Sequence, residues 1–251
     1  MLLMIGYSFI FFSILLPSIS DLIPGVDHQK IQLNRYGKNI EIDIFTLNPD
    51  SIDVDIINVT KGATIKQFLY NTNSSNEYFL VCNAGMFDID NKTNMGYMKN
   101  KGDVLNSRKH PQYYSVMAFD PLLKKLPNFY LYDTDVTSLD SIISKYDSVI
   151  QNLRLIKRNG ENRWPKQDKR WQELAIGQDA DNNIIIIYCH NSLSMSDFNE
   201  LILSLPLKLV AAQHLEGNFS AQLYFGFDKY KIDYDNGEYV PNLIGFKSKK
   251  F

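Results

Sequence analysis

The chain has 251 residues, of which 45% are hydrophobic and 22% are charged. This is the composition of an ordinary globular protein, and no shift in composition marks a linker, so we expect one folded domain. The 26 basic and 28 acidic side chains leave a net charge of -2, which offers no attractive field for a polyanion. We therefore expect no nucleic-acid partner.

An apolar segment opens the chain. Residues 1–16 are almost wholly apolar and lead into Pro17-Ser18-Ile19-Ser20, where small residues suit signal-peptidase cleavage. The run is short for a membrane span, which takes about 20 apolar residues. No Lys or Arg precedes it, so both a cleaved signal peptide and an uncleaved anchor stay open for residues 1–20. We expect residues 21–251 to form an exported domain, periplasmic or extracellular, that meets the membrane only through that segment.

Strands dominate the rest of the pattern. Alternating apolar and polar residues across residues 30–60 predict two half-buried strands joined through Asn48-Pro49-Asp50. Residues 98 and 103 flank Lys101-Gly102, which predicts a hairpin. Further strands are expected at residues 78–83, 113–119, 129–132, 149–156, 174–176, 184–188, 207–215 and 221–227.

Helices are expected at residues 61–70, 138–145 and 194–203, the last two with Ser138 and Ser194 as N-caps. Because the few short helices do not alternate regularly with strands, we predict an α+β fold. It would be a single strand-rich domain with a mixed or antiparallel sheet core. Cys82 and Cys189 both lie in apolar runs, so one disulfide or two buried thiols are both compatible with the pattern.

Polar groups cluster where apolar strands end. The run Val81-Cys82 stops at Asn83-Ala84-Gly85, and Asp88 follows. A site on a rigid strand end is held more precisely than one on a long loop. Asn83 is therefore a candidate substrate-binding residue and Asp88 a candidate catalytic carboxylate.

Glu216 is the sharpest catalytic candidate. It closes a predicted strand directly before Gly217, a residue that lets the backbone approach a ligand closely. His214 lies two positions earlier and is expected on the same side of the strand. Glu173 and Asp88 are the other acids that could pair with Glu216, since two carboxylates facing one sugar are what glycoside hydrolysis needs.

Arg154 and the four histidines are the remaining candidate site residues. Arg154 lies in a passage rich in arginine, and its fork of donors suits two-point contact with a phosphate diester. The four histidines show no metal-ligand spacing. The oxygen-rich run Asp88-Ile89-Asp90-Asn91 leaves room for a divalent cation without indicating one, so we expect no cofactor.

Several short motifs recur in order along the chain and together resemble the phosphodiester glycosidase family, which is related to the lysosomal uncovering enzyme. The motifs are Asn83-Ala84-Gly85-Met86-Phe87, Gly96-Tyr97-Met98, Gln151-Asn152-Leu153-Arg154, Trp171-Gln172-Glu173, Ala175-Ile176-Gly177, Glu216-Gly217, Ala221-Gln222-Leu223-Tyr224 and Pro241-Asn242-Leu243-Ile244-Gly245. Glu216-Gly217-Asn218 departs from relatives that carry two glycines after the acid.

The resemblance implies an exported hydrolase that cleaves the glycosidic bond of a sugar-1-phosphodiester, with a carbohydrate phosphodiester as its substrate. Glu216 would be the catalytic carboxylate, aided by Glu173 or Asp88. The substrate would be bound by Asn83, Gln151, Arg154, His214 and Gly217. The missing second glycine leaves open a non-catalytic protein of the same fold that binds envelope glycan or exopolysaccharide. Metal-dependent cleavage of the P–O bond is a third hypothesis.

Overall fold

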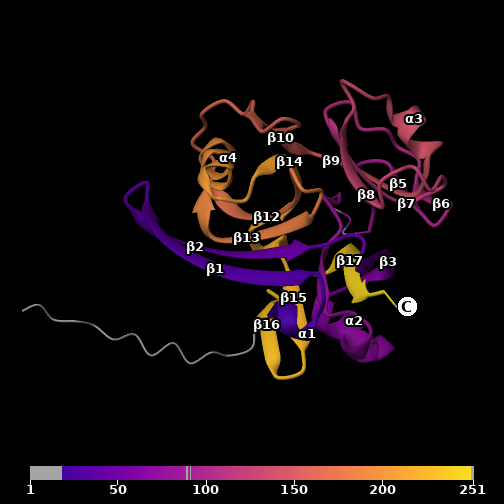
Figure 1. Cartoon of the computed structure of the whole chain (residues 1–251), viewed down its shortest axis with the longest axis horizontal. Helices are drawn as coiled ribbons and strands as arrows, with labels where there is room; N and C mark the ends of the chain where they lie inside the picture. The colour runs from indigo at the N-terminus through magenta and orange to yellow at the C-terminus, as the bar shows by residue number, and fades with distance from the viewer. Residues whose placement is uncertain (1–18, 89, 91, 250–251) are drawn as a thin grey trace, which may run out of the picture.

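The computed structural model describes residues 19–88, 90 and 92–249, and three antiparallel sheets make up most of this part of the chain (Figure 1). The expected signal or anchor segment lies outside the described residues except for Ile19 and Ser20, which begin α1 (Ile19–Leu22). Among the residues that are described, no helix combines the length and the apolar character needed to cross a membrane.

The largest sheet has seven strands in the order β1-β2-β13-β12-β14-β10-β11. Its outer hairpin pairs β1 with β2 over ten residues each, and this long ribbon extends to one side of the molecule (Figure 1). The strands are β1 (Val26–Arg35), β2 (Lys38–Leu47), β13 (Ile184–Leu193), β12 (Trp171–Asp179), β14 (Leu209–Gly217), β10 (Arg154–Lys157) and β11 (Glu161–Asn162).

Two five-stranded sheets complete the fold, with the orders β16-β15-β4-β17-β3 and β6-β5-β9-β7-β8. The first comprises β16 (Tyr230–Tyr234), β15 (Leu223–Phe227), β4 (Leu80–Asn83), β17 (Val240–Ser248) and β3 (Ile52–Ala63). The second comprises β6 (Asp103–Asn106), β5 (Met98–Asn100), β9 (Tyr146–Asn152), β7 (Ser115–Pro121) and β8 (Phe129–Asp133).

The remaining helices are short and begin at polar caps. Thr64 and Gln67 form a capping box at the start of α2 (Ile65–Thr72). Ser138 caps α3 (Leu139–Ile143), and Ser194 caps α4 (Met195–Ser204) through the Asp197 N–H. Two 3₁₀ turns, η1 (Ser74–Asn76) and η2 (Asn218–Ser220), complete the helical elements among the described residues.

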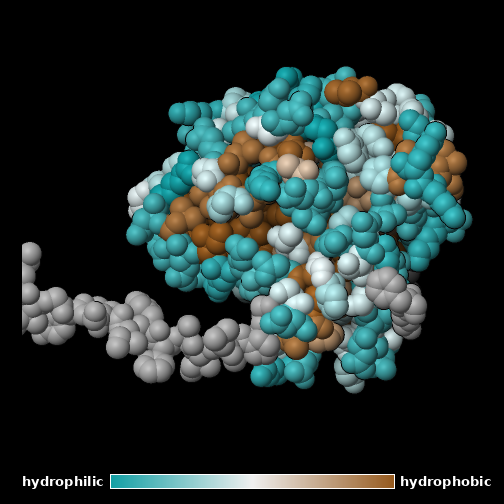
Figure 2. Space-filling model, in the orientation of Figure 1, coloured by the Kyte–Doolittle hydropathy of each residue, from teal (hydrophilic) through white to brown (hydrophobic). Residues whose placement is uncertain are grey.

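The largest sheet is covered on both faces. On one face, Leu174, Ile176 and Leu215 join the main core, which also draws side chains from the two smaller sheets. On the other face, Ala175 packs in a second core with Phe198 of α4. In Figure 2, apolar residues gather in a hollow between α4 and the β1–β2 ribbon, ringed by hydrophilic residues. The inner strands β2, β13, β12 and β14 are therefore apolar on both sides.

The strand-rich prediction is confirmed, and the label α+β fits only loosely because the fold is mostly β. Every strand pair among the described residues is antiparallel. The predicted hairpin at Lys101-Gly102 and all three predicted helices form, although the first helix begins at Ile65 because residues 61–63 belong to β3. Cys82 and Cys189 are buried free thiols.

One predicted strand proves to be two. The stretch expected to run unbroken over residues 149–156 divides into β9 and β10, which belong to different sheets. The break falls at Leu153, whose N–H is held by the Asn152 side chain at 2.9 Å instead of by a neighbouring strand. An asparagine side chain that binds the next backbone N–H competes with the sheet ladder in this way.

Candidate active site

The ends of three strands from the three sheets converge on one region. The Oδ1 atom of Asn83 on β4 accepts a hydrogen bond from the Gln222 N–H at 2.7 Å. The carbonyl of Leu153, between β9 and β10, accepts one from the N–H of His214 on β14 at 2.9 Å. The segment after β4 reaches β14 as well, since the Phe87 N–H binds the Glu216 carboxylate. Residues from four of the motifs quoted above are therefore joined by one connected set of contacts.

Glu216 is a partly buried carboxylate held by backbone donors. The N–H groups of Gly217, at 2.9 Å, and of Phe87 both point to it. Burial raises the pKa of Glu216 above its usual 4.5, although nearby His214 and the two N–H groups pull that pKa down. Tyr113 faces the same carboxylate: burial and the negative charge of Glu216 raise the pKa of Tyr113 to about 12.

Glu216 and His214 do not share a face of β14, contrary to the expectation from their spacing. A β-bulge at Leu215 places Glu216 opposite Leu174 and His214 opposite Ala175. Paired residues of an antiparallel ladder share a face, whereas consecutive residues of one strand alternate. The extra residue of the bulge therefore turns Glu216 toward the main core and His214 toward the second core.

His214 and Glu173 form a buried pair on that second face. The Nδ1 atom of His214 lies in hydrogen-bond contact with one oxygen of Glu173. The other oxygen accepts a hydrogen bond from Trp171 Nε1 at 2.8 Å. Both partners are almost fully buried, with side-chain exposures of 4% for His214 and 2% for Glu173. Both carboxylate oxygens of Glu173 are thus engaged within the protein.

Buried amides surround the loop that follows β4. A Cβ atom on Gly85 would lie 2.5 Å from Asn152 Nδ2 and 3.5 Å from Asn94 Oδ1, so the Asn152 side chain leaves no room for a side chain at this position. Asn83 Nδ2, Asn152 Nδ2 and Asn94 Oδ1 find no hydrogen-bond partner among the described residues, nor does either amide atom of Gln213. Native proteins seldom leave buried polar atoms unpaired, so such a concentration is typical of a binding region.

The site residues lie in a part of the chain that matches a known family. The sequence profile of phosphodiester glycosidases matches residues 76–247, which is more than half of the chain. The chain belongs to the phosphodiester glycosidase family. The match includes every candidate residue named above, whereas β1 and β2 precede it. No curated protein is similar enough in sequence to count as a match.

Solved structures of similar fold are distant in sequence. The catalytic domain of zebrafish N-acetylglucosamine-1-phosphodiester alpha-N-acetylglucosaminidase, auto-inhibited by its pro-peptide, is 12% identical with a TM-score of 0.66, over 90% of this chain and 84% of that one. A hypothetical protein from Synechocystis is 13% identical with a TM-score of 0.67 over 90% of this chain. This chain spans 62% of that protein's length. At such identities the likeness shows the fold alone.

Within the glycosidase fold, Gln151 is committed to the backbone. Its Oε1 accepts hydrogen bonds from the N–H groups of Tyr97 and His110, and its Nε2 donates to the carbonyls of His110 and Tyr113. A side-chain amide offers two donors and two acceptor sites, so all four are used. Gln151 holds the segment that carries Tyr113 and leaves no polar atom for a substrate.

Arg154 is likewise engaged. Its Nη1 lies 3.1 Å from Asp133 and 2.8 Å from Asp135, and its guanidinium lies over the ring of Tyr114 at 5.3 Å. Only 13% of the Arg154 side chain is exposed. The two carboxylates already neutralise the charge that was predicted to meet a phosphate.

Asp88 lies in the loop after β4, whereas Gly217 packs against Trp171. Asp88 follows Phe87 in the loop that contacts Glu216, and its own N–H donates to the Thr93 carbonyl. A Cβ atom on Gly217 would lie 2.9 Å from the Trp171 ring, so the close approach that requires glycine is to Trp171. Of the predicted acids, Asp88 therefore lies on the segment that contacts Glu216, whereas Glu173 is tied to His214.

Four residues of this region were missed as site residues: Asn94, Tyr113, Asn152 and Gln213. Asn152 stood inside a quoted motif, and its place beside Gly85 gives that motif a physical meaning. Tyr113 carried no local signal, because it reaches Glu216 only through the fold.

Proposed function

We propose that this chain is an exported hydrolase that cleaves the bond between the anomeric carbon of a sugar and a phosphodiester oxygen, with Glu216 as the carboxylate that stabilises the cationic sugar carbon. The observation that supports this best is the position of Glu216: it is partly buried and contacts the Asn83-Ala84-Gly85-Met86-Phe87 motif through the Phe87 N–H. A carboxylate removed from bulk water stabilises a developing positive charge more strongly than one in solution.

The leaving group determines what else the site must supply. The departing phosphomonoester is a weak base, so its oxygen needs less acid assistance than the alcohol released by an ordinary glycosidase. The second carboxylate would then act on water, and Asp88 is our choice for this role because it is one residue from Phe87. Glu173 becomes a positioning residue, since it fixes His214 beside the bulge that orients Glu216.

Amide donors replace Arg154 in the binding scheme. The unpaired Nδ2 atoms of Asn83 and Asn152 are donors in need of an acceptor. A ligand oxygen, or a water bridging to one, would satisfy them and recover the cost of about 1–3 kcal/mol that an unpaired buried donor carries. Sugar hydroxyl and phosphate oxygens both meet this requirement.

Incubation of the purified chain with a panel of sugar-1-phosphodiesters tests the proposal. The expected products are free sugar and a phosphomonoester. In water labelled with heavy oxygen, no label should enter the phosphomonoester, because P–O cleavage on the sugar side would give the same products with the label on phosphorus. Release of a sugar 1-phosphate without free sugar would instead mean P–O cleavage, and loss of that activity with a chelator would support the metal-dependent hypothesis. No release from any member of a panel that varies the sugar and its anomeric configuration would count against catalysis.

A glycan-binding protein without catalysis is the second candidate, and the state of Arg154 favours it. With both Asp133 and Asp135 bound, this arginine brings no free charge for a phosphate. Under this alternative, polysaccharide fragments bind wild type and Glu216→Gln equally, and neither turns over a phosphodiester. Turnover by wild type alone excludes it.

Export is also part of the proposal and rests on the apolar start of the sequence. The experiment is to express the full chain in a host with a secretory pathway and to determine the N-terminal residue of the mature protein by mass spectrometry. Cleavage near residue 20 indicates a signal peptide, and an intact membrane-bound chain indicates an anchor. An intact chain that stays in the cytosol would contradict export.

A further inference from the structure

A second cluster of functional side chains lies toward the β1 edge of the largest sheet, on β2 and β13. Glu41 and Asp43 are two apart on β2 and share a face, and His190 lies on the neighbouring strand β13. One ligand atom from each of these three residues lies within 4.8 Å of the other two. Glu41 and Asp43 both precede the part of the chain that matches the family profile.

The donor atoms converge on the Oδ2 side of Asp43. His190 Nε2 lies 2.7 Å from Asp43 Oδ2 and 3.6 Å from Glu41 Oε1. Bonds of about 2.0–2.1 Å to a tetrahedral zinc ion keep ligand atoms about 3.3 Å apart. The Glu41–His190 separation is near this value, and the Asp43–His190 separation must open by about 0.6 Å, which a side-chain rotation supplies.

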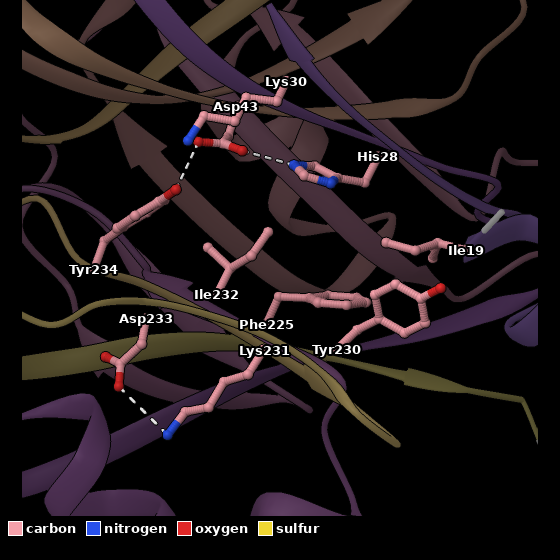
Figure 3. A pocket seen from close by; sticks show the side chains of 10 residues that line it. All are labelled: Ile19, His28, Lys30, Asp43, Phe225, Tyr230, Lys231, Ile232, Asp233 and Tyr234. Carbon is pink, nitrogen blue, oxygen red and sulfur yellow. Dashed lines mark hydrogen bonds and ion pairs between the residues drawn. The ribbon is translucent and has the colours of Figure 1, made fainter. Parts of the chain in front are cut away.

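Neighbouring groups orient these donors as the outer shell of a metal site does. His28 Nε2 binds Asp43 Oδ1 at 2.7 Å and thereby directs Oδ2 toward His190. Tyr234 donates to Asp43 Oδ2 at 2.8 Å (Figure 3), and its ring packs edge-on against the His190 imidazole at 4.6 Å. Lys30 lies 2.6 Å from Glu41 Oε1.

The cluster is accessible. The side chains of His190 and Glu41 are 23% and 30% exposed, whereas Asp43 is fully buried beneath them. A cavity of about 430 Å³ adjoins it, lined by His28, Lys30, Asp43 and, from the β15–β16 hairpin, by Phe225 and Tyr234 (Figure 3). An ion can therefore enter from solvent.

We propose that Glu41, Asp43 and His190 bind one divalent transition-metal ion of the zinc class. The ion takes the place of the proton between His190 Nε2 and Asp43 Oδ2, and the imidazole keeps its hydrogen on Nδ1. An imidazole with two carboxylates suits Zn²⁺, Co²⁺ or Mn²⁺ better than Ca²⁺, which prefers six to eight oxygen ligands. Three protein ligands leave one position for water.

A hydrogen-bonded network without metal is the competing explanation, and Lys30 separates the two. Its ammonium group occupies a Glu41 oxygen that the ion needs, so it competes with the metal. Lys30→Met should therefore strengthen metal binding several-fold, on the scale of one exposed ion pair. A network that binds no metal predicts no such gain.

The test uses the full chain after removal of metal by a chelator, titrated with Zn²⁺ by calorimetry and with Co²⁺ by visible absorption. Wild type should bind one ion per chain. His190→Gln and Glu41→Gln should each weaken metal binding by roughly 100-fold. Removing an outer-shell partner already costs about 10–100-fold, and a direct ligand should cost at least as much. His110→Gln, which removes an imidazole outside the cluster, is the matched control and should bind like wild type.

Circular dichroism establishes that each variant is folded, and partly exposed Glu41 makes Glu41→Gln the safer of the two ligand variants. The proposal is overturned if folded wild type binds no Zn²⁺ or Co²⁺ in a one-to-one ratio. It is equally overturned if His190→Gln and Glu41→Gln bind as wild type does, or if Ca²⁺ binds more tightly than Zn²⁺. None of these results decides whether the chain cleaves sugar phosphodiesters, which is measured separately.

Discussion

The carboxylate of Glu173 holds the imidazole of His214 inside the largest sheet, on the face of β14 that Glu216 does not share. The bulge at Leu215 places two acids that are close in the sheet, Glu173 and Glu216, in different surroundings. One is paired with a histidine and a tryptophan, and the other lies at the junction of the sheets.

The His214–Glu173 pair predicts a pH dependence of stability. Burial alone would lower the pKa of His214, but the charge and hydrogen bond of Glu173 outweigh burial and raise that pKa above 6.5. A raised pKa in the folded state stabilises the protein fully below about pH 6.5, and this contribution is lost as the pH rises through the folded value. Urea unfolding across this range should show the free energy of unfolding of wild type falling relative to Glu173→Gln. Parallel curves would contradict the assignment.

Glu216→Gln should separate catalysis from folding. The proposed charge at the sugar carbon predicts a loss of turnover of roughly 100-fold or more, the scale of one preorganised electrostatic group. The pKa of Glu216 is raised by burial, so the ionised form destabilises the fold at pH values above that pKa.

The melting temperature of Glu216→Gln should accordingly equal that of wild type below about pH 4.5 and exceed it at neutral pH. Turnover and melting are to be measured on one preparation. A variant with wild-type turnover per folded molecule would remove Glu216 from the mechanism.

Gly85 and Asn152 should be energetically coupled. Gly85→Ala places a methyl group 2.5 Å from Asn152 Nδ2, and such overpacking costs about 1–3 kcal/mol of unfolding free energy. Asn152→Ala makes room, so the double variant should lose less stability than the sum of the two single losses. Chemical denaturation of all four proteins gives the coupling energy, and strict additivity would show that the two side chains do not meet.

Arg154→Met should affect stability more than substrate binding. It removes the ion-pair partner of buried Asp133, which keeps only the hydrogen bond from the Arg158 N–H. This loss costs roughly 3 kcal/mol, whereas KM per folded molecule should hardly change. Arg163→Met is the matched control, because Arg163 pairs with Glu161 in the open and such a pair contributes at most about 1 kcal/mol. A large rise in KM with unchanged stability would restore Arg154 as a phosphate ligand.

Periodicity and caps predicted much of the fold. Ser138, Ser194 and the alternation at Ile40, Ile42 and Ile44 act locally, so their consequences are readable from neighbouring residues. The outer strand β1 and the late strands β16 and β17 were missed. On β1 the residues are mostly intermediate or exposed, so its hydrophobic alternation is weak. The buried run of β17 lacks alternation because its two faces pack in two different cores.

The sequence predicted that the site lies at strand ends, but it did not predict the role of each residue there. Glu216 contacts Phe87, which lies on the segment that follows Asn83, and clustered polar residues after apolar strands had suggested such an arrangement. The bulge at Leu215, the four backbone hydrogen bonds of Gln151 and the two carboxylates on Arg154 all depend on segments far apart in the chain. Spacing along one strand cannot reveal an extra residue whose partner strand sets the register.

The break at Leu153 connects the sheet that contains β9 directly to the sheet that contains β10. The chain leaves one sheet at Asn152 and enters another at Arg154, and the Leu153 carbonyl is tied to His214 of that second sheet. We expect local opening at this end of either sheet to disturb the junction. A ligand bound there therefore slows amide hydrogen exchange in both sheets at once, even in strands that it never touches.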